Sequence, residues 1–560
     1  MAGASGHATD PARKVAIGRL QTLAAYVACL TGWRQVAVAV LAGAASVLAM
    51  APFFFSPILF ITLPVLVWLM DGSISRAATG SALQRVKRAA FVGWLFGLGY
   101  FLAGLFWIGE AFLVEAERFA WLLPFAVTLM PAGLALFWAT ATGVAAYAWR
   151  PGLTRVLVLA LTLSAAEWMR GHILTGFPWN VVGYALTSPL PLMQSAGIFG
   201  VYGLTLLAVI VFAIPLVAFA DVGADRRRWR AAALATLAAL MPLPIVWGYG
   251  EMRLAEPAPP VIEGVRLRLV QPSVPQREKW RPENQREIFF DHLAMSKQAP
   301  DGADVGLAGI THVIWPEAAM PFLPLGSPDA MRLIGDLLPD ETRLISGALR
   351  LDEQSSAEPS GRRVFNSLIV FGPDGKPESI YDKIHLVPFG EYLPLQPWLE
   401  AIGLQKMVAW RGGFSTGQSP RPLLKAPGLP SVAALICYEA IFPAAVVQGA
   451  DRPQALINLT NDGWFGNTTG PRQHFHQARV RAVEEGLALI RVANNGITGV
   501  VDANGRVLAQ IGLNERGVID TSLPGPQSPT VYARYGDWIF VISWLMVLAC
   551  VLFRLRRYSF

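Results

Sequence analysis

The sequence contains little cysteine and little charge, and both shortages limit what the protein can be. Only three cysteines occur among 560 residues, and Cys29 and Cys550 lie in strongly apolar segments near the two ends of the chain. A disulfide framework is therefore excluded, and Cys437 has no plausible disulfide partner. Charged residues make up 15% of the chain, whereas an ordinary soluble domain carries about a quarter. We therefore expect a membrane protein with a soluble part.

The patterns of nucleotide and metal sites are also missing. No Walker or Rossmann glycine motif occurs, so we expect no nucleotide. The seven histidines show no ligand spacing, and Cys437 lacks a second thiol, so we expect no metal and no other cofactor. His474 and His476 are two residues apart, which on a helix points them away from each other, and we expect both to be solvated.

Long uncharged stretches are the main feature that the sequence does have. They cover residues 35–70, 89–109, 119–149, 173–220, 231–250 and 538–553. Because a spanning helix needs about 20 apolar residues, these stretches predict a polytopic α-helical membrane protein with about eight transmembrane helices. Two lie within 35–70, and the others at 89–109, 121–149, 156–168, within 196–220, at 231–249 and at 538–553. The role of residues 20–32 is left open.

The positive charges predict how these helices are oriented, because Lys and Arg concentrate in short cytoplasmic loops. One set of loops holds clusters such as Arg226, Arg227, Arg228 and Arg230, whereas the opposite short loops hold only Arg118 and Arg170. We therefore place both termini in the cytoplasm and the large segment between the seventh and eighth helices outside it. The net charge of +7 is then a consequence of membrane topology and does not indicate nucleic-acid binding.

That large segment is expected to form an α/β domain. Eight β-rich runs alternate with helical or turn stretches, at 265–270, 311–315, 343–348, 366–371, 432–436, 455–459, 488–492 and 498–501. Turn sequences at 372–375 and 503–505 separate hairpin strands. We predict a cytoplasmic segment 1–34, a membrane domain 35–250, a linker 251–260, an extracytoplasmic domain 261–530, and an eighth helix with a cytoplasmic tail 531–560.

Three residues with complementary chemistry are expected at strand ends: Glu317, Lys383 and Cys437. A thiol near its ordinary pKa of about 8.5 is mostly protonated at neutral pH, so a nearby carboxylate is needed to take its proton as it attacks. The oxyanion that forms needs positive charge or N–H donors, which a buried ammonium and the backbone amide after Cys437 supply. Taken singly, each residue has an ordinary structural explanation, since most free cysteines are small buried hydrophobes.

The joint presence of the three, in the order Glu, Lys, Cys, resembles the nitrilase superfamily of carbon-nitrogen hydrolases. The resemblance rests on the motifs at 315–317, 381–392 and 437–439. An insertion of such a domain between the last two of eight membrane helices resembles the apolipoprotein N-acyltransferase family, as do the motifs at 42–53, 274–280 and 459–465. The resemblance to the nitrilase superfamily implies that the domain is an αββα sandwich.

The resemblance also implies a role for each site residue. Glu317 is the general base, Lys383 the oxyanion stabiliser and Cys437 the nucleophile. Glu391, eight residues after the lysine, is a second carboxylate that positions the site. Tyr438, Glu439 and Trp280 are further positions that shape the pocket, although for Trp280 simple packing is an equal alternative.

By the same resemblance, the reaction is the transfer of an acyl chain from the sn-1 position of a membrane phospholipid. The chain passes through a thioester on the cysteine to the α-amino group of an N-terminal diacylglyceryl-cysteine on an apolipoprotein. The implied location is a bacterial inner membrane, with the catalytic domain on the periplasmic side, and we expect a monomer.

Two loops are candidates for contact with the lipid substrates. Residues 398–410 are apolar and form either a lid that dips into the lipid or an ordinary packed helix. The loop at 171–180 either folds back towards the outer domain or is a plain interfacial loop.

Two other functions are open from the sequence. One is a membrane-anchored nitrilase or amidase that uses water to hydrolyse a small C–N substrate. The other is a transporter or scaffold whose outer domain only binds. Transport is disfavoured because, apart from Glu167, the predicted spans lack ionisable residues.

Overall fold

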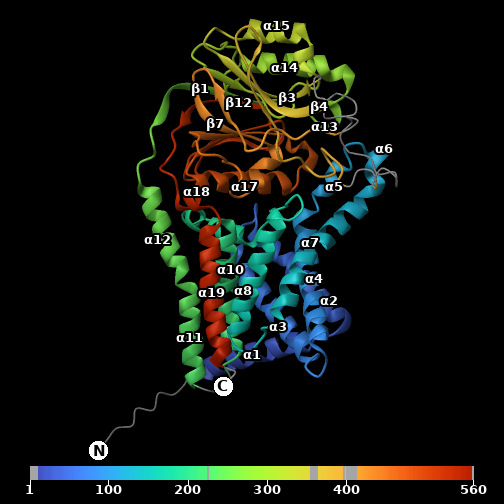
Figure 1. The fold of residues 1–560 in the computed structure, drawn as a ribbon, viewed down its shortest axis with the longest axis vertical. Coiled ribbons are helices and arrows are strands. Elements are labelled where there is room, and N and C mark those ends of the chain that lie inside the picture. Colours follow the sequence, from blue (N-terminus) through green and yellow to red (C-terminus); the bar gives the residue numbers. More distant parts are fainter. Residues whose placement is uncertain (1–10, 223–225, 353–362, 395–397, 399–412, 558–560) are drawn as a thin grey trace, which may run out of the picture.

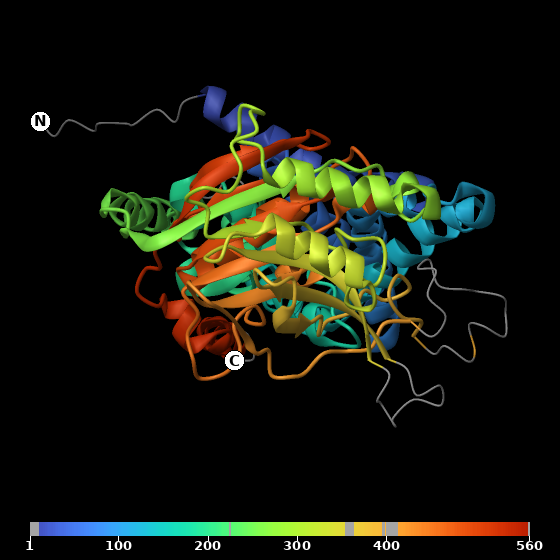
Figure 2. The same cartoon turned by 90° about the horizontal axis from the view of Figure 1, so that it is seen from above.

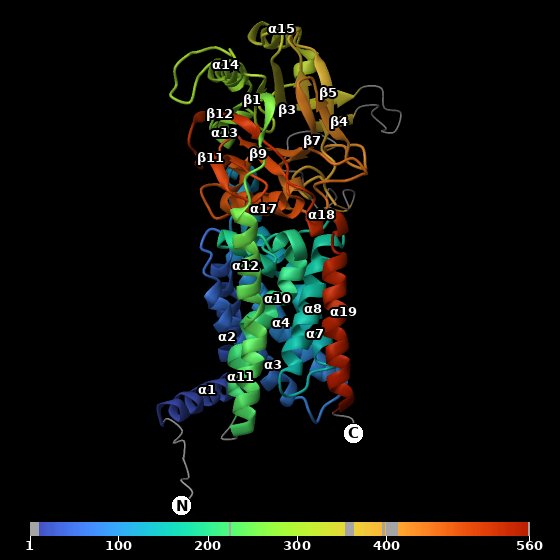
Figure 3. The same cartoon turned by 90° about the vertical axis from the view of Figure 1, so that its left-hand side faces the viewer.

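A computed structural model describes residues 11–222, 226–352, 363–394, 398 and 413–557. A bundle of long helices forms one half of the molecule and an α/β domain forms the other (Figures 1 and 3). The chain enters the domain from the end of α12 and leaves it into α19. The free end of α19 lies at the end of the bundle that is remote from the domain (Figure 3).

The helical half contains ten longer helices and three short ones among the described residues. The longer ones are α1 (Pro11–Cys29), α2 (Gly32–Ser46), α3 (Leu59–Ser75), α4 (Ala82–Leu105), α7 (Leu123–Ala145), α8 (Thr154–His172), α10 (Ala196–Ala220), α11 (Arg226–Leu240), α12 (Pro242–Ala255) and α19 (Trp538–Arg557). The short ones are α5 (Ile108–Ala111), α6 (Ala116–Phe119) and α9 (Leu190–Met193). Residues 20–32, which had no assigned role, belong largely to α1, which packs against α3.

Seven helical stretches in the described chain are long and apolar enough to cross a membrane. They correspond to seven of the eight predicted helices, with α11 and α12 forming one of them. The remaining predicted helix is α8, which packs in the bundle between α7 and α10. Helix α8 is not among the seven apolar stretches, because it carries three charged residues: Arg155, Glu167 and Arg170.

The prediction that Glu167 is the one ionisable residue of the spans was therefore wrong. Helix α8 begins two residues before the predicted stretch and runs four residues beyond it, and so includes both arginines. Each of these charges is paired. Arg170 Nη2 lies 2.5 Å from Glu167 Oε2. Arg155 Nη2 lies 2.8 Å from Asp221 Oδ1, and Arg155 Nε lies 3.3 Å from Asp71 Oδ2. Buried charges in membrane helices are tolerated when they are paired in this way.

The described residues of the outer domain form two six-stranded sheets. The first has the order β12-β1-β2-β3-β4-β5 and the second the order β11-β10-β9-β8-β7-β6. The strands of the first sheet are β1 (Val261–Gln271), β2 (His312–Ile314), β3 (Arg343–Asp352), β4 (Arg363–Phe371), β5 (Pro377–Asp382) and β12 (Gly517–Pro524). Those of the second are β6 (Leu423–Ala426), β7 (Leu429–Ile436), β8 (Ala455–Thr460), β9 (Ala488–Ala493), β10 (Thr498–Val501) and β11 (Val507–Ile511).

The two sheets pack face to face through their apolar inner residues. Leu269 and Ile314 of the first sheet share one core with Val432 and Ile457 of the second. Helices α14 (Gln285–Ser296) and α15 (Pro328–Leu337) cover the outer face of the first sheet (Figures 1 and 2). Helix α17 (Gly470–Glu485) covers the second sheet and lies between it and the membrane bundle (Figure 1). The predicted αββα sandwich is confirmed.

All eight predicted strands are present, and the described residues form four more. Strands β5 and β11 are edge strands that pair across the turns at 372–375 and 503–505, as those turn sequences predict. Their residues alternate between exposed and more buried, so neither forms an apolar run. The site lies where β2, β5 and β7 end, because Trp315, Lys383 and Cys437 directly follow these three strands.

Candidate active site

Cys437 stands at the turn between β7 and a single 3-10 turn, residues Cys437–Ile441. Its φ is +51°, in the left-handed region that non-glycine residues rarely occupy and that is typical of functional turns. The side chain is buried, with 7% of the residue exposed. Burial raises the pKa of the thiol, and the nearby Glu317 carboxylate raises it further. The thiol is therefore protonated at neutral pH and needs a base.

Glu317 follows β2 and is held against the neighbouring strand. Gly347 of β3 makes this possible, because a Cβ there would lie 2.6 Å from the Glu317 Cα. The carboxylate accepts a hydrogen bond of 2.8 Å from Asn366 Nδ2. Burial raises the pKa of Glu317 and Glu391 raises it further, although Lys383 opposes them. The carboxyl group is thus a stronger base than an exposed glutamate.

Lys383 follows β5, and its ammonium is buried between two carboxylates. Its Nζ lies 2.9 Å from Glu391 and 3.8 Å from Glu317 Oε1. Burial alone would lower the pKa of Lys383, but Glu391 and Glu317 more than offset it and raise the pKa above its ordinary value. The side chain therefore stays charged, as an oxyanion stabiliser requires.

Glu391 is fixed by three donors. Its carboxylate accepts hydrogen bonds from Lys383 Nζ at 2.9 Å, from Asn366 Nδ2 at 2.9 Å and from the Val387 backbone N–H at 2.8 Å. Asn366 therefore bridges the two carboxylates beside the ammonium. This network holds Lys383 in one orientation.

Glu439 joins the turn after Cys437 to the segment after Lys383. Its carboxylate accepts hydrogen bonds from the backbone N–H groups of Ile436 (2.8 Å), Ile384 (2.9 Å) and His385 (3.1 Å), and from Tyr381 and Arg421. Burial alone would raise the pKa of Glu439, but Arg421 and the backbone donors hold it below its ordinary value. Glu439 therefore positions the two strand ends relative to each other.

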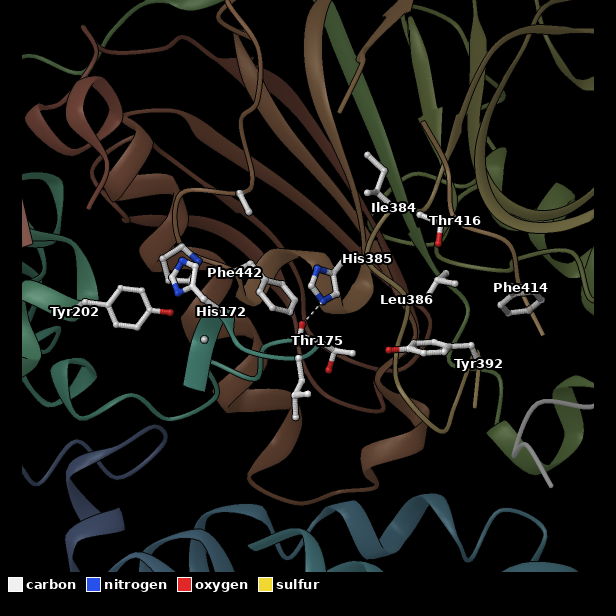
Figure 4. Close-up of a pocket in the computed structure, with 14 residues that line it drawn as sticks. His172, Thr175, Tyr202, Ile384, His385, Leu386, Tyr392, Phe414, Thr416 and Phe442 are labelled. Atoms are coloured by element: carbon white, nitrogen blue, oxygen red, sulfur yellow. Dashed lines mark hydrogen bonds between the residues drawn. The ribbon is translucent and has the colours of Figure 1, made fainter. Parts of the chain in front are cut away.

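Tyr438 connects the site to the membrane domain. Its hydroxyl donates a 3.0 Å hydrogen bond to the Gly176 carbonyl, and its ring stacks with Phe177. His385, two residues after Lys383, also contacts this loop, because its Nε2 lies 2.7 Å from the Thr175 carbonyl oxygen (Figure 4). Of the two alternatives for the loop 171–180, the structure therefore shows the one in which the loop folds back onto the outer domain.

Comparisons with known sequences identify the family to which this arrangement belongs. Residues 42–214 match the apolipoprotein N-acyltransferase N-terminal domain, and residues 267–526 match the carbon-nitrogen hydrolase domain. The chain is 45% identical to the apolipoprotein N-acyltransferase of Rhodopseudomonas palustris, over 96% of this chain and 98% of the relative. It is 46% identical to that of Bradyrhizobium diazoefficiens, over 97% and 98%. The chain belongs to the apolipoprotein N-acyltransferase family.

It is therefore an acyltransferase enzyme and a multi-pass membrane protein. A further relative, the apolipoprotein N-acyltransferase of Brucella suis, is 42% identical over 96% of this chain and 98% of the relative. Among solved structures, the chain is similar to an amidase from Nesterenkonia sp. This similarity has a TM-score of 0.31 and 20% identity and covers 47% of this chain and 92% of the amidase.

The sequence analysis missed a buried lysine of the acyltransferase beside the base. Lys279, at the end of α13 (Gln276–Lys279), donates a 3.0 Å hydrogen bond from Nζ to the Glu317 backbone carbonyl. Burial lowers the pKa of Lys279 to about 8. Its neighbour Trp280 is 37% exposed, so it is not a core packing residue. The part of Trp280 in shaping the pocket stays a prediction.

The expectation that His474 and His476 are solvated was wrong. Both are buried in α17, because that helix lies between the second sheet and the membrane bundle. His474 Nε2 lies 3.1 Å from the Cys437 carbonyl oxygen, and His474 Nδ1 lies 2.9 Å from Asp462 Oδ1. His476 Nε2 lies 2.7 Å from Thr187 Oγ1, in the membrane domain. No sequence motif places these partners together.

Cys437, Asp462 and His474 offer ligand atoms within 4.8 Å of one another, the spacing of a metal site. The arrangement does not fit a cation, however, because both ring nitrogens already have partners. The Asp462 carboxylate also accepts from Arg491 at 2.8 Å and from Thr460 at 3.0 Å. A metal ion would have to displace these donors and lie next to a guanidinium group.

A cavity of about 550 Å³ lies where the 171–175 segment meets the outer domain. Figure 4 shows Tyr202 and His172 on one side of it and Tyr392 and Phe414 on the other. Ile384 and His385 line the cavity, but Glu317, Lys383 and Cys437 are not among its described lining residues. The cavity is therefore adjacent to the site and does not contain it. The segment 398–410, expected to be either a lid or a packed helix, lies outside the described residues except for Trp398, which is 77% exposed.

Proposed function

We propose that the enzyme transfers an acyl chain from a membrane phospholipid to the α-amino group of the N-terminal diacylglyceryl-cysteine of apolipoproteins. The acyl chain passes through a thioester on Cys437. The observation that carries this proposal is the buried thiol at a left-handed turn, set beside a buried ammonium and two carboxylates. That arrangement supplies a nucleophile, a base and an electrostatic stabiliser for acyl transfer.

In the first half-reaction, Glu317 accepts the thiol proton as Cys437 Sγ attacks the ester carbonyl carbon. The charge that develops on the carbonyl oxygen is stabilised by the Lys383 ammonium and the Tyr438 backbone N–H. Collapse of this intermediate breaks the ester C–O bond. The leaving lysophospholipid oxygen takes the proton from Glu317, which returns to its carboxylate form.

In the second half-reaction, the neutral α-amino group of the acceptor attacks the thioester carbonyl carbon. Glu317 accepts the amine proton, and the same donors stabilise the second oxyanion. The C–S bond then breaks, and the thiolate takes the proton from Glu317. The products are the N-acylated lipoprotein and the free enzyme.

The membrane domain suits two lipid-anchored substrates. A soluble enzyme would have to extract each chain from the bilayer at about 0.8 kcal/mol per CH₂ group. The hydrogen bonds from the site to Gly176 and Thr175 support a position at the bilayer surface. We propose that the domain faces the periplasm of a bacterial inner membrane, that both termini are cytoplasmic, and that the chain acts as a monomer.

The experiment that tests this function uses purified enzyme, vesicles of phospholipid with a deuterated sn-1 chain, and a synthetic diacylglyceryl-cysteine peptide with a free amine. Mass spectrometry is expected to find the deuterated chain in amide linkage on the peptide. The Cys437→Ala variant and an N-acetylated peptide are the controls, and neither should give product. Release of deuterated free fatty acid without acylated peptide would instead show a hydrolase.

A further inference from the structure

A buried polar network lies beside Cys437, and its hydrogen bonds among the described residues do not involve Lys383 or Glu317. His474 of α17 is fully buried, as are Arg491 of β9 and Asp462 after β8. Asp462 Oδ1 lies 2.9 Å from His474 Nδ1, and Arg491 Nη2 lies 2.8 Å from Asp462 Oδ2 and 3.0 Å from His474 Nδ1. The imidazole ring is therefore fixed in the plane that these two partners set.

The far nitrogen of this ring is directed at the backbone of the nucleophile. His474 Nε2 lies 3.1 Å from the Cys437 carbonyl oxygen. A carbonyl oxygen can only accept a hydrogen bond, so Nε2 carries a hydrogen and donates it, whatever the charge of the ring. A second donor near this oxygen is Asn458 Nδ2, at a weak 3.5 Å.

That carbonyl belongs to the same peptide unit as the Tyr438 N–H. A peptide unit is planar and trans, so its C=O and N–H bonds point in opposite directions. A donor that holds the oxygen on one side therefore fixes the direction of the N–H on the other. The Tyr438 N–H is also in the first turn after the strand, where a backbone amide has no acceptor within the helix.

We propose that His474 is a positioning residue, which holds the Cys437–Tyr438 peptide so that its N–H points at the developing oxyanion. This inference rests on the proposed role of Cys437 as nucleophile. The φ of +51° at Cys437 is an uncommon conformation that needs support from its surroundings. Asp462 and Arg491 act one step further back, since they orient the ring.

The test compares two reactions of Cys437 in the full-length enzyme. Acylation by a p-nitrophenyl ester passes through a tetrahedral oxyanion, whereas alkylation by iodoacetamide is a direct displacement and does not. His474→Phe keeps the ring and removes both nitrogens, and we expect it to slow acylation about 30- to 100-fold, below the 100- to 1,000-fold that removal of a direct oxyanion donor costs. Alkylation should stay within about threefold of wild type, because no oxyanion forms in that step.

Two further variants separate the hydrogen bond from the packing. His474→Gln places an amide N–H close to the position of Nε2, and we expect it to restore acylation to within about tenfold of wild type, since the donor is regained. His476→Gln is the matched control, because His476 is buried in the same helix but bonds Thr187. It should acylate at the wild-type rate.

Full acylation activity in His474→Phe would overturn the inference. So would a parallel loss of acylation and alkylation in a folded variant, because the damage would then lie at the thiol. If His474→Phe does not fold, Asp462→Asn provides the same comparison, with the same two outcomes. The soluble ester acylates Cys437 whatever the natural donor is, so failure of the phospholipid assay and failure of this inference are distinguishable.

Discussion

At the scale of single residues, burial sets the chemistry of the base. The pKa of Glu317 is raised by burial and by Glu391, and only the deprotonated carboxylate can accept the thiol proton. The rate of Cys437 acylation should therefore decrease as the pH falls through a value above the ordinary 4.5. Glu317→Gln should lose about 10²- to 10⁴-fold in rate and show no such decrease. A pH profile of p-nitrophenyl ester acylation measures both, and an unchanged profile in Glu317→Gln would assign the base elsewhere.

Lys279 provides a second test at this scale. Its positive charge lowers the pKa of Glu317, so Lys279→Met should move the acidic limb of the same pH profile to higher pH. Lys376→Met is the control, because Lys376 is exposed and its ion pair among the described residues is with the exposed Asp374. An acidic limb that stays in place in Lys279→Met would show that this ammonium does not act on the base.

Sequence reasoning found the residues with reactive groups and missed those that hold them. Glu317 and Cys437 follow apolar strands and Lys383 lies in a recognisable motif, so their positions could be predicted. Asn366 lies inside strand β4, and the residues next to it in the sequence do not indicate that its side chain bridges the Glu317 and Glu391 carboxylates. His474 was predicted to be solvated. Its burial could not be predicted, because its partners come from β9 and from the segment after β8, and only the folded chain brings them together.

At the scale of elements, Glu439 ties the end of β5 to the end of β7. Its pairing with Arg421 is fully buried, at 3.2 Å. Glu439→Gln leaves the guanidinium without a counter-charge, and loss of one partner of a buried pair costs about 3–5 kcal/mol. We expect a clear decrease in melting temperature in detergent, together with loss of acylation.

The matched control for this variant is Glu378→Gln, which removes a carboxylate paired with Arg343 at a more exposed position. Its melting temperature should stay close to that of wild type, since exposed pairs contribute about 0–1 kcal/mol. Equal melting temperatures for Glu439→Gln and wild type would contradict the tie between the two strands.

The element predictions succeeded where an apolar run marks a buried strand or helix. Strands β8 and β9 are buried along their whole length, and β7 is buried from Val432 to Ile436; all three were predicted. Strand β6 is four residues long, and β12 has intermediate residues at its centre, so neither forms an apolar run. The ends of α8 could not be predicted, because both carry an arginine that only a partner makes compatible with burial. Arg155 pairs with Asp71 and Asp221, which are distant in the sequence, and Arg170 pairs with Glu167 one helical turn away.

At the scale of the whole molecule, the site depends on the contact between the two halves. Gly176 lies in a turn of the 171–180 loop and has a φ of +70°. A Cβ added to Gly176 would lie 2.3 Å from the Gly171 carbonyl oxygen and 3.2 Å from Phe442 Cε1. Gly176→Ala should therefore displace the turn and lower both the melting temperature and the rate of acyl transfer. The left-handed backbone alone costs about 1–2 kcal/mol, and the steric conflict adds to it.

Gly152 provides the control for backbone strain. Its φ is +84°, and a Cβ there would meet nothing within 4 Å. Gly152→Ala should therefore lose stability only through the strain of a left-handed backbone and should keep its acyl transfer activity. Equal losses of activity in the two variants would show that the contact at Gly176 has no special importance for the site.

The docking of the domain on the bundle was the least predictable feature. The sequence offered two equal alternatives for the loop 171–180. The contacts that decide between them join residues 210 or more positions apart, such as His385 with Thr175 and Trp179 with Gln473. The loop is also held by Arg170, whose guanidinium donates to the carbonyl of Trp179 at 3.0 Å. Such contacts leave no periodic pattern in a sequence.

The central claim is that Cys437 carries the acyl chain, and the intact mass of the enzyme tests it most directly. The protein is incubated with phospholipid and weighed before and after treatment with neutral hydroxylamine, beside Cys437→Ala. We predict a mass gain of one acyl chain that hydroxylamine removes and that is absent from the variant. An unmodified wild-type enzyme in the presence of accessible phospholipid, or an adduct that persists in Cys437→Ala, would contradict the account.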